Sequence, residues 1–190
     1  MGDSYMTRSE MADVLTRTEL AMISTLEAFS RWTVFLNKAV SDAALAHQDI
    51  WILHSIRMRG GAQNLSEILL FLNRNDVSSI QYSLKKLERH GLVERVVGNS
   101  KREAGYMLTQ EGEDMTQEYA TLRDQLLLDI VSEQTSIEGA LMQSAQTMER
   151  LTGLYDQATQ VVLNRKILEP SAFPEGSSAP QGKARVKTGA

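Results

Sequence analysis

The chain has 190 residues, of which 42% are apolar and 23% are charged, values close to those of ordinary globular domains. It contains no cysteine, which excludes disulfides, thiolate metal sites and a cysteine nucleophile. The net charge of −4 argues against a uniformly basic surface, although residues 64–109 carry more basic than acidic side chains. No apolar run is long enough for a signal peptide or a transmembrane helix, so we expect a cytoplasmic protein without a membrane partner.

The first predicted element is a long helix over residues 16–46, preceded by a flexible segment at residues 1–15. A second helix is predicted over residues 48–58, and Gly60-Gly61 ends it because glycine disfavours a helix interior. All three prolines lie beyond residue 169, which favours a mostly helical chain before them. The first helix has a mostly apolar face at steps of three and four, formed by Leu20, Ile23, Leu26, Phe29, Thr33, Leu36 and Val40.

Two shorter helices with a turn between them follow. Asn64 and Glu67 have a spacing that resembles a capping box, which starts a short helix. Residues 73–76 suit a turn, and Asn75 or Asp76 caps the next helix. That helix ends at His90-Gly91, and its apolar stripe consists of Val77, Ile80, Leu84 and Leu87.

The pattern then changes to that of a β-hairpin. Residues 93–97 are rich in β-branched side chains, residues 98–100 suit a turn, and residues 106–108 form a second short strand. The tip of the hairpin is basic. Thr109 caps a helix predicted to run to Val131, a last helix spans residues 136–166, and residues 169–190 are expected to be disordered. The helix after Thr109 carries Met115, Tyr119, Leu122, Leu126 and Ile130 on one face.

The helix after the turn has a polar side opposite its apolar stripe, with hydrogen-bonding side chains first and cations further on. The major groove of DNA admits one such helix, a preceding helix braces it, and a basic hairpin tip beside it suits the minor groove. Any solvated helix face also looks polar, so the hairpin is what favours DNA. The candidate DNA contacts are Ser66, Ser78, Ser79, Gln81, Tyr82, Lys85, Lys86, Lys101 and Arg102.

Three short motifs connect these elements: L-S-E from Leu65, L-E-x-x-G-L-V from Leu87 and L-T-x-x-G from Leu108. In this order and spacing they resemble the winged-helix core of the MarR family of bacterial transcription regulators. The resemblance covers residues 48–112, and related winged-helix groups share the motifs. One departure is that Ser100 stands where the family's wing has an aspartate, which leaves Arg102 at the position of the minor-groove arginine.

The resemblance implies a mainly α fold with a small β-hairpin wing, in which a winged helix-turn-helix domain is flanked by N- and C-terminal dimerisation helices. The corresponding segments are residues 16–46, 47–112 and 113–168, and residues 169–190 form the tail. It also implies pockets for small, often aromatic, effectors. Apart from the resemblance, the last helix has a heptad-like seam that favours a homodimer, formed by Leu141, Ser144, Met148, Leu151, Tyr155, Ala158 and Val162.

Other kinds of site find little support in the sequence. His47, His54 and His90 are not accompanied by further converging ligands, so neither a metal nor a cofactor is expected. No phosphate-binding loop or nucleophile–base arrangement stands out, so an enzyme is not expected. Trp32, Trp51 and His54 are the candidate residues for an effector pocket, although aromatic residues at helical spacing belong more often to a core.

The sequence therefore predicts a homodimeric repressor that binds double-stranded DNA at a pseudo-palindromic operator and that a small aromatic ligand modulates. Two alternatives remain open. The acidic net charge suits a winged helix used only for protein contact, and the missing wing aspartate suits a ligand-binding helical protein whose winged helix has decayed.

Overall fold

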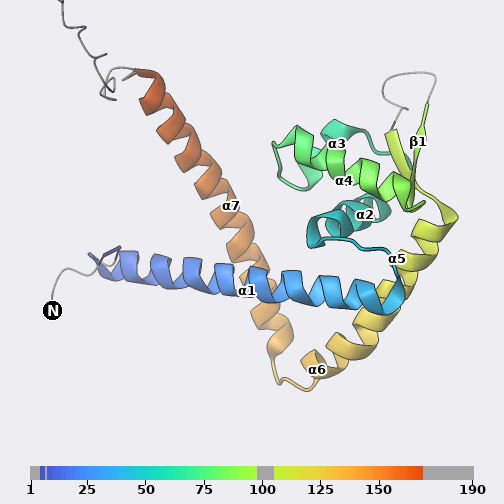
Figure 1. Cartoon of the computed structure of the whole chain (residues 1–190). Helices are drawn as coiled ribbons and strands as arrows, with labels where there is room; N and C mark the ends of the chain where they lie inside the picture. The colour runs from blue at the N-terminus through green and yellow to red at the C-terminus, as the bar shows by residue number, and fades with distance from the viewer. Residues whose placement is uncertain (1–4, 7, 98–104, 169–190) are drawn as a thin grey trace, which may run out of the picture. The chain divides into compact units, whose positions relative to one another are not determined.

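The computed structural model describes residues 5–6, 8–97 and 105–168. It divides into two compact units, Met1–Glu133 and Gln134–Ala190. Among the described residues, the first unit contains most of the helices and a two-stranded sheet, and the second contains one long helix (Figure 1). The elements run in the order α1 (Glu10–Val40), α2 (His47–Arg59), α3 (Leu65–Phe71), α4 (Val77–Arg89), β1 (Val93–Val96), β2 (Gly105–Leu108), α5 (Gln110–Arg123), the π-helical turn η1 (Asp124–Leu128), α6 (Asp129–Ser132) and α7 (Ile137–Leu168).

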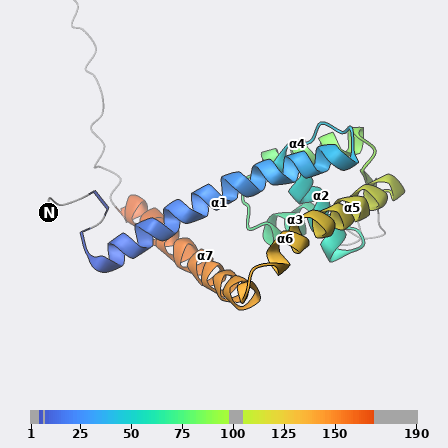
Figure 2. The same ribbon diagram turned by 90° about the horizontal axis from the view of Figure 1, so that it is seen from below.

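Helix α1 begins and ends about six residues earlier than the sequence predicted. Ser9 caps it, since its hydroxyl accepts a hydrogen bond from the Ala12 N–H at 3.1 Å, so Glu10–Leu15 are helical. At the other end Ser41 adopts an extended conformation and its hydroxyl accepts from the Ala43 N–H, which starts a loop over residues 41–46. The C-terminal part of α1 packs on α2 and α5, while its N-terminal part projects beyond the other helices of the first unit (Figure 2).

Helices α2, α3 and α4 form the centre of the first unit around one apolar core. The predicted capping box of α3 is confirmed: Asn64 Oδ1 accepts from the Glu67 N–H at 3.0 Å, and Glu67 Oε2 accepts from the Asn64 N–H at 2.8 Å. The apolar stripe of α4 is buried except at its first member, Val77, which is exposed. The most deeply buried apolar side chains in this region are Ile50, Ile52, Leu53, Ile56, Ile68, Ile80, Leu84, Leu87 and Leu92.

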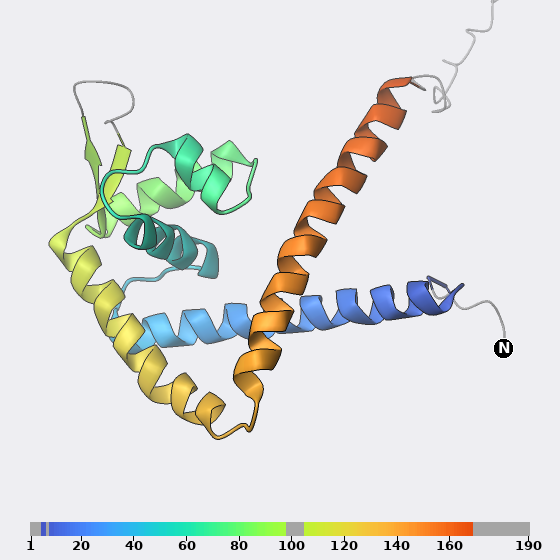
Figure 3. The same ribbon diagram turned by 180° about the vertical axis from the view of Figure 1, so that it is seen from behind.

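The predicted hairpin is an antiparallel pair of strands, β1 and β2, in which Val93 faces Leu108 and Val96 faces Gly105 (Figure 3). Strand β1 ends one residue earlier than predicted, and β2 begins one residue earlier than predicted. Gln63, just before α3, adds a further bridge, because the backbones of Gln63 and Tyr106 exchange hydrogen bonds of 2.8 and 2.9 Å. The hairpin is thereby tied to the entrance of α3. The hairpin tip, with Lys101 and Arg102, lies outside the described residues.

The two motifs L-E-x-x-G-L-V and L-T-x-x-G contain two glycines and one threonine with clear structural roles. Gly91 has a φ of +71°, the left-handed conformation that ends a helix at little cost for glycine. Gly112 packs against the backbone, since a Cβ there would lie 2.1 Å from the Leu92 carbonyl oxygen. Thr109 connects the two regions: its hydroxyl accepts from the Gly112 N–H and donates to the Gly91 carbonyl. The motif residues therefore hold α4, β2 and α5 together.

The helix predicted to run to Val131 is interrupted. Residues Asp124–Leu128 form a π-helical turn, and α6 then continues to Ser132. A π-helical turn is wider than an α-helical one, so the residues after it no longer follow the 3.6-residue period. Met115 and Tyr119 lie on the predicted face and are buried, whereas Leu126 and Ile130 are exposed.

Helix α7 belongs to the second unit and begins within one residue of its predicted start. Most of its described side chains are exposed. Among the residues of the predicted seam, Leu141, Met148 and Val162 are exposed, and Leu151 and Tyr155 are partly buried. None of the helices in the described part of the chain combines the length and apolar character needed to cross a membrane.

Candidate nucleic-acid interface

The surface of α4 that faces away from the core is polar and exposed. Because Ile80, Leu84 and Leu87 are turned into the core, the helical period turns the opposite side of α4 to solvent. Four of the predicted DNA contacts lie on this side and are exposed: Ser78, Gln81, Tyr82 and Lys85. Together they offer hydroxyl, amide and ammonium groups, which can bond base edges or phosphates. We call these four residues the outer face of α4.

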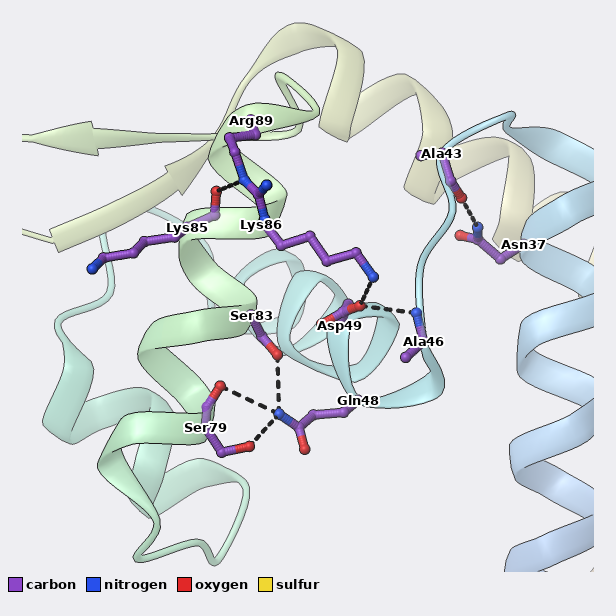
Figure 4. A network of polar contacts seen from close by, with 10 residues as sticks. All are labelled: Asn37, Ala43, Ala46, Gln48, Asp49, Ser79, Ser83, Lys85, Lys86 and Arg89. Atoms are coloured by element: carbon purple, nitrogen blue, oxygen red, sulfur yellow. Dashed lines mark hydrogen bonds and ion pairs between the residues drawn. The ribbon is translucent and has the colours of Figure 1, made fainter.

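Two other predicted contacts on α4 do not belong to the outer face. Ser79 is partly buried, and its hydroxyl accepts a hydrogen bond from Gln48 Nε2 at 2.8 Å. Lys86 Nζ lies 2.7 Å from Asp49 Oδ2, so this cation is paired with a carboxylate on α2 (Figure 4). The sequence placed Ser79 and Lys86 with the outer face because helical periodicity locates the apolar stripe but not the boundary of the polar side.

The carboxylate of Asp49 is almost completely buried, with 4% of its side chain exposed. Burial by itself would raise the pKa of Asp49, but hydrogen bonds from its partners and the positive charge of Lys86 outweigh this and lower it. Asp49 also accepts from the Ala46 N–H at 2.8 Å, which caps the start of α2. The carboxylate is therefore ionised in the folded protein and holds both its own helix and α4.

The turn between α3 and α4 carries Arg74, which was not among the predicted DNA contacts. Arg74 Nε donates to Asp76 Oδ1 at 2.7 Å, and its Nη2 donates to Gln48 Oε1 at 3.3 Å. Its hydrogen bond lowers the pKa of Asp76 to about 2 and raises the pKa of Arg74. Asp76 occupies the predicted cap position but makes no side-chain cap bond, because its carboxylate binds Arg74 instead. The sequence feature that could have identified Arg74 is its position two residues before Asp76, which suits a local ion pair.

The remaining candidate contacts surround α4. Ser66 is exposed on the first turn of α3. Arg89 is exposed at the end of α4, where its Nε donates to the Lys85 carbonyl at 3.4 Å. Arg95 is exposed on β1 and was also missed, since a single arginine in a short strand gives no pattern. The structure thus brings together on one unit the outer face of α4, a helix that braces it and a cation on the adjacent strand.

Two of the three residues proposed to bind an effector each lie against another aromatic ring. The Trp51 ring lies 5.1 Å from the Phe29 ring, and the His54 ring lies 4.3 Å from the Tyr119 ring, centroid to centroid. Trp32 is half-buried against the core. Burial lowers the pKa of His54 to about 4, and among the described residues its Nε2 has no hydrogen-bond partner. His54 is therefore neutral at physiological pH.

An open pocket of about 700 Å³ lies between the end of α1, the end of α4 and α5. Carboxylates line much of it, including Asp42, Glu111, Asp114 and Glu118. Such a lining disfavours an anionic ligand. Within the described residues no three histidine or carboxylate groups are arranged to hold a metal ion.

Comparison with known proteins places this arrangement in a recognised family of domains. Residues 45–112 match the model of the winged helix DNA-binding domain. No curated protein matches the sequence.

Solved structures share the fold over most of the chain. Staphylococcus aureus MarR in complex with salicylate and kanamycin is 15% identical with a TM-score of 0.61, over 78% of this chain and 95% of that one. The MarR family transcription regulator SP03579 is 18% identical with a TM-score of 0.58, over 80% and 99%. The S. aureus MepR–DNA complex is 18% identical with a TM-score of 0.53, over 71% and 93%. The predicted fold is therefore confirmed: the chain contains a winged helix DNA-binding domain and has the fold of the MarR family of transcription regulators.

Proposed function

We propose that this protein is a transcription regulator that binds double-stranded DNA sequence-specifically as a homodimer. The observation that carries the proposal is the outer face of α4, where four exposed hydrogen-bonding side chains stand on a helix whose opposite side is buried. A rigid helix with such a face can enter the major groove, and its side chains can discriminate between base pairs.

Within this proposal the residues of the interface have different tasks. Gln81 can pair with adenine through both atoms of its amide, so it is the strongest candidate for reading a base. Lys85 and Arg89, one turn apart, and Arg95 on β1 supply charge that phosphates attract without regard to sequence. Ser66 at the start of α3 suits a phosphate contact from the bracing helix. The wing residues Lys101 and Arg102 remain candidates for the minor groove.

Exposed apolar surface supports the homodimer. Leu20, Ile23 and Leu26 are each more than half exposed on the N-terminal part of α1, at spacings of three residues. On α7, the seam residues Leu141 and Val162 are also more than half exposed. Large apolar side chains that are exposed in this way are common at protein interfaces. A two-fold dimer would present two copies of α4 to half-sites about one helical turn of DNA apart, so the operator should be an inverted repeat.

Repression and control by a ligand complete the proposal. A dimer that occupies an operator would block transcription, and a small aromatic molecule would release it by favouring a different spacing of the two α4 helices. The MarR structure with bound salicylate supports a ligand of this class. Trp51 and His54 lie three residues apart on α2 with Phe29 and Tyr119 beside them, so they remain the candidate ligand contacts. The acidic pocket near α5 is a poorer match for such a ligand.

The experiment compares wild type with Gln81→Ala and Lys85→Ala on duplexes selected from a random pool. Gln81→Ala should relax the preference at one base position in each half-site and leave the others intact. Lys85→Ala should weaken binding to all duplexes alike and reduce the salt dependence. Binding to the selected duplexes that neither substitution alters would contradict the assignment of α4 as the reading helix.

A winged helix used for protein contact is the second candidate. Leu70 on α3 is 82% exposed and Tyr82 on α4 is 66% exposed, so the Leu70 side chain and the ring of Tyr82 add apolar contact area beside the polar groups of the helix-turn-helix surface. The net charge of −4 is in line with this alternative. Specific DNA binding by the wild-type protein would exclude it as the principal function.

A further inference from the structure

The first turn of α2 holds α4 through two adjacent residues, Gln48 and Asp49 (Figure 4). Gln48 Nε2 donates to the hydroxyls of Ser79 and Ser83, at 2.8 and 3.0 Å. Asp49 Oδ2 accepts from Lys86 Nζ at 2.7 Å. These contacts join residues 31 to 37 positions apart in the sequence, so they form only when α2 and α4 have packed.

The residues held on α4 form one stripe along the helix. Ser79, Ser83 and Lys86 follow each other at steps of four and three, and they extend over about 10 Å of the helix axis. The stripe lies at the side of α4, between its buried face and its outer face. Apolar packing is not directional, so it permits small rotations and slides that hydrogen bonds of fixed length do not. Three polar contacts at two ends of one stripe fix both the rotation and the axial position of α4.

Gln48 extends this control to the turn before α4. Its Oε1 accepts from Arg74 Nη2 at 3.3 Å, and Arg74 is bonded to Asp76 at the start of α4. The side-chain amide of Gln48 thus uses both its donor and its acceptor atoms. Gln48 therefore contacts α4 through Ser79 and Ser83 and the turn through Arg74, so it links the two segments.

Small movements of α4 matter for reading DNA. Side chains on a helix reach about 5–6 Å from its axis, so a rotation of about 10° displaces their ends by roughly 1 Å. Hydrogen bonds to base edges tolerate a range of only about 0.5 Å in length. A rotation of this size would misalign Gln81 with a base and leave phosphate contacts, which depend on charge, nearly unchanged.

We propose that Gln48 and Asp49 are positioning residues for DNA sequence recognition, which set the orientation of α4 through Ser79, Ser83 and Lys86 without touching the DNA. This inference rests on the proposed function of α4. It also gives Lys86 a structural task, as the partner of a buried carboxylate, in place of a phosphate contact.

The test uses the full chain with Gln48→Met, which keeps the length of the side chain and removes its hydrogen bonds. Gln117→Met, an exposed glutamine of α5, is the matched control. Three quantities are measured for each protein: the affinity for the operator obtained by selection, the affinity for a scrambled duplex of equal length, and the melting temperature. Gln48→Met should lower operator affinity by about a hundredfold, which is the loss of one well-aligned base contact, worth about tenfold, in each of the two half-sites of the dimer. Affinity for the scrambled duplex and its salt dependence should stay unchanged, and Gln117→Met should match wild type.

An unchanged ratio of operator to scrambled affinity in Gln48→Met would overturn the inference. So would a parallel fall of both affinities together with the melting temperature, since that indicates only a damaged fold. Lys86→Met distinguishes the two possible roles of that lysine. If Lys86 positions α4, only the affinity for the operator should fall. If Lys86 contacts a phosphate, the affinities for the operator and the scrambled duplex should fall equally, and the salt dependence of binding should decrease. A wild-type protein that prefers no sequence would refute the proposed function itself, and this is seen before any variant is compared.

Discussion

The burial of His54 predicts that acid destabilises the fold. Burial lowers the pKa of this histidine from 6.5 to about 4, so the folded state favours the neutral ring. A group whose pKa is lowered on folding contributes its stability above the unfolded pKa and loses it as the pH falls towards the folded pKa. The loss therefore begins near pH 6.5 and is complete near pH 4. The full shift corresponds to about 3 kcal/mol, of which about 2 kcal/mol is lost by pH 5.

A loss of this size is a large part of the stability of an ordinary domain, which is about 5–15 kcal/mol. In a chain of this length it lowers the melting temperature by roughly 4–8 °C. Wild type and His54→Phe should be melted at pH 7 and pH 5, at one protein concentration, because dimer formation also stabilises. Phenylalanine keeps a ring against Tyr119 but cannot be protonated.

His54→Phe should lose most of the difference between the two pH values. His90→Gln, which removes an exposed histidine, should keep it. Equal pH dependence in wild type and His54→Phe would refute the argument, since it would mean that His54 can be protonated in place without cost.

Three further predictions concern the fold and the DNA contacts. Gly112→Ala should lower the free energy of unfolding by about 2 kcal/mol or more in urea denaturation, because the added Cβ would meet the Leu92 carbonyl. The control is Gly153→Ala on the exposed surface of α7, which should be neutral or stabilising by up to about 1 kcal/mol. Asn64→Ala should lower the free energy of unfolding by about 1 kcal/mol through loss of the α3 cap, and an unchanged urea midpoint would contradict this. Lys85→Ala should reduce the slope of log affinity against log salt by about two, because a homodimer loses one phosphate contact in each half-site, and an unaltered slope would show that Lys85 makes no phosphate contact.

Features that depend on neighbouring residues in the sequence could be predicted. The capping box of Asn64 and Glu67 forms within one helical turn, so its spacing is sufficient evidence. The same holds for Gly91 and for Thr109, which lie where the chain changes direction. The start of α1 was missed although Ser9 is a good cap residue, because the apolar face becomes regular only further along the chain.

Features that depend on distant residues could not be predicted. The inward contacts of Ser79 and Lys86 require Gln48 and Asp49, and no local pattern reveals a pairing across more than thirty positions. The π-helical turn at Asp124–Leu128 has no signal in the apolar periodicity, which predicted Leu126 and Ile130 on one helix face with the buried Met115 and Tyr119. The outer face of α4 was predictable in part because it is the complement of a regular apolar stripe.

The most direct test of the proposed function is selection of duplexes from a random pool by the wild-type protein, repeated at two salt concentrations. A dimeric reader should enrich an inverted repeat with half-sites about one helical turn apart, and its affinity should fall steeply as the salt concentration rises. Weak binding that salt barely changes, with no enriched sequence, would contradict the function proposed for α4 and favour a winged helix that binds other proteins.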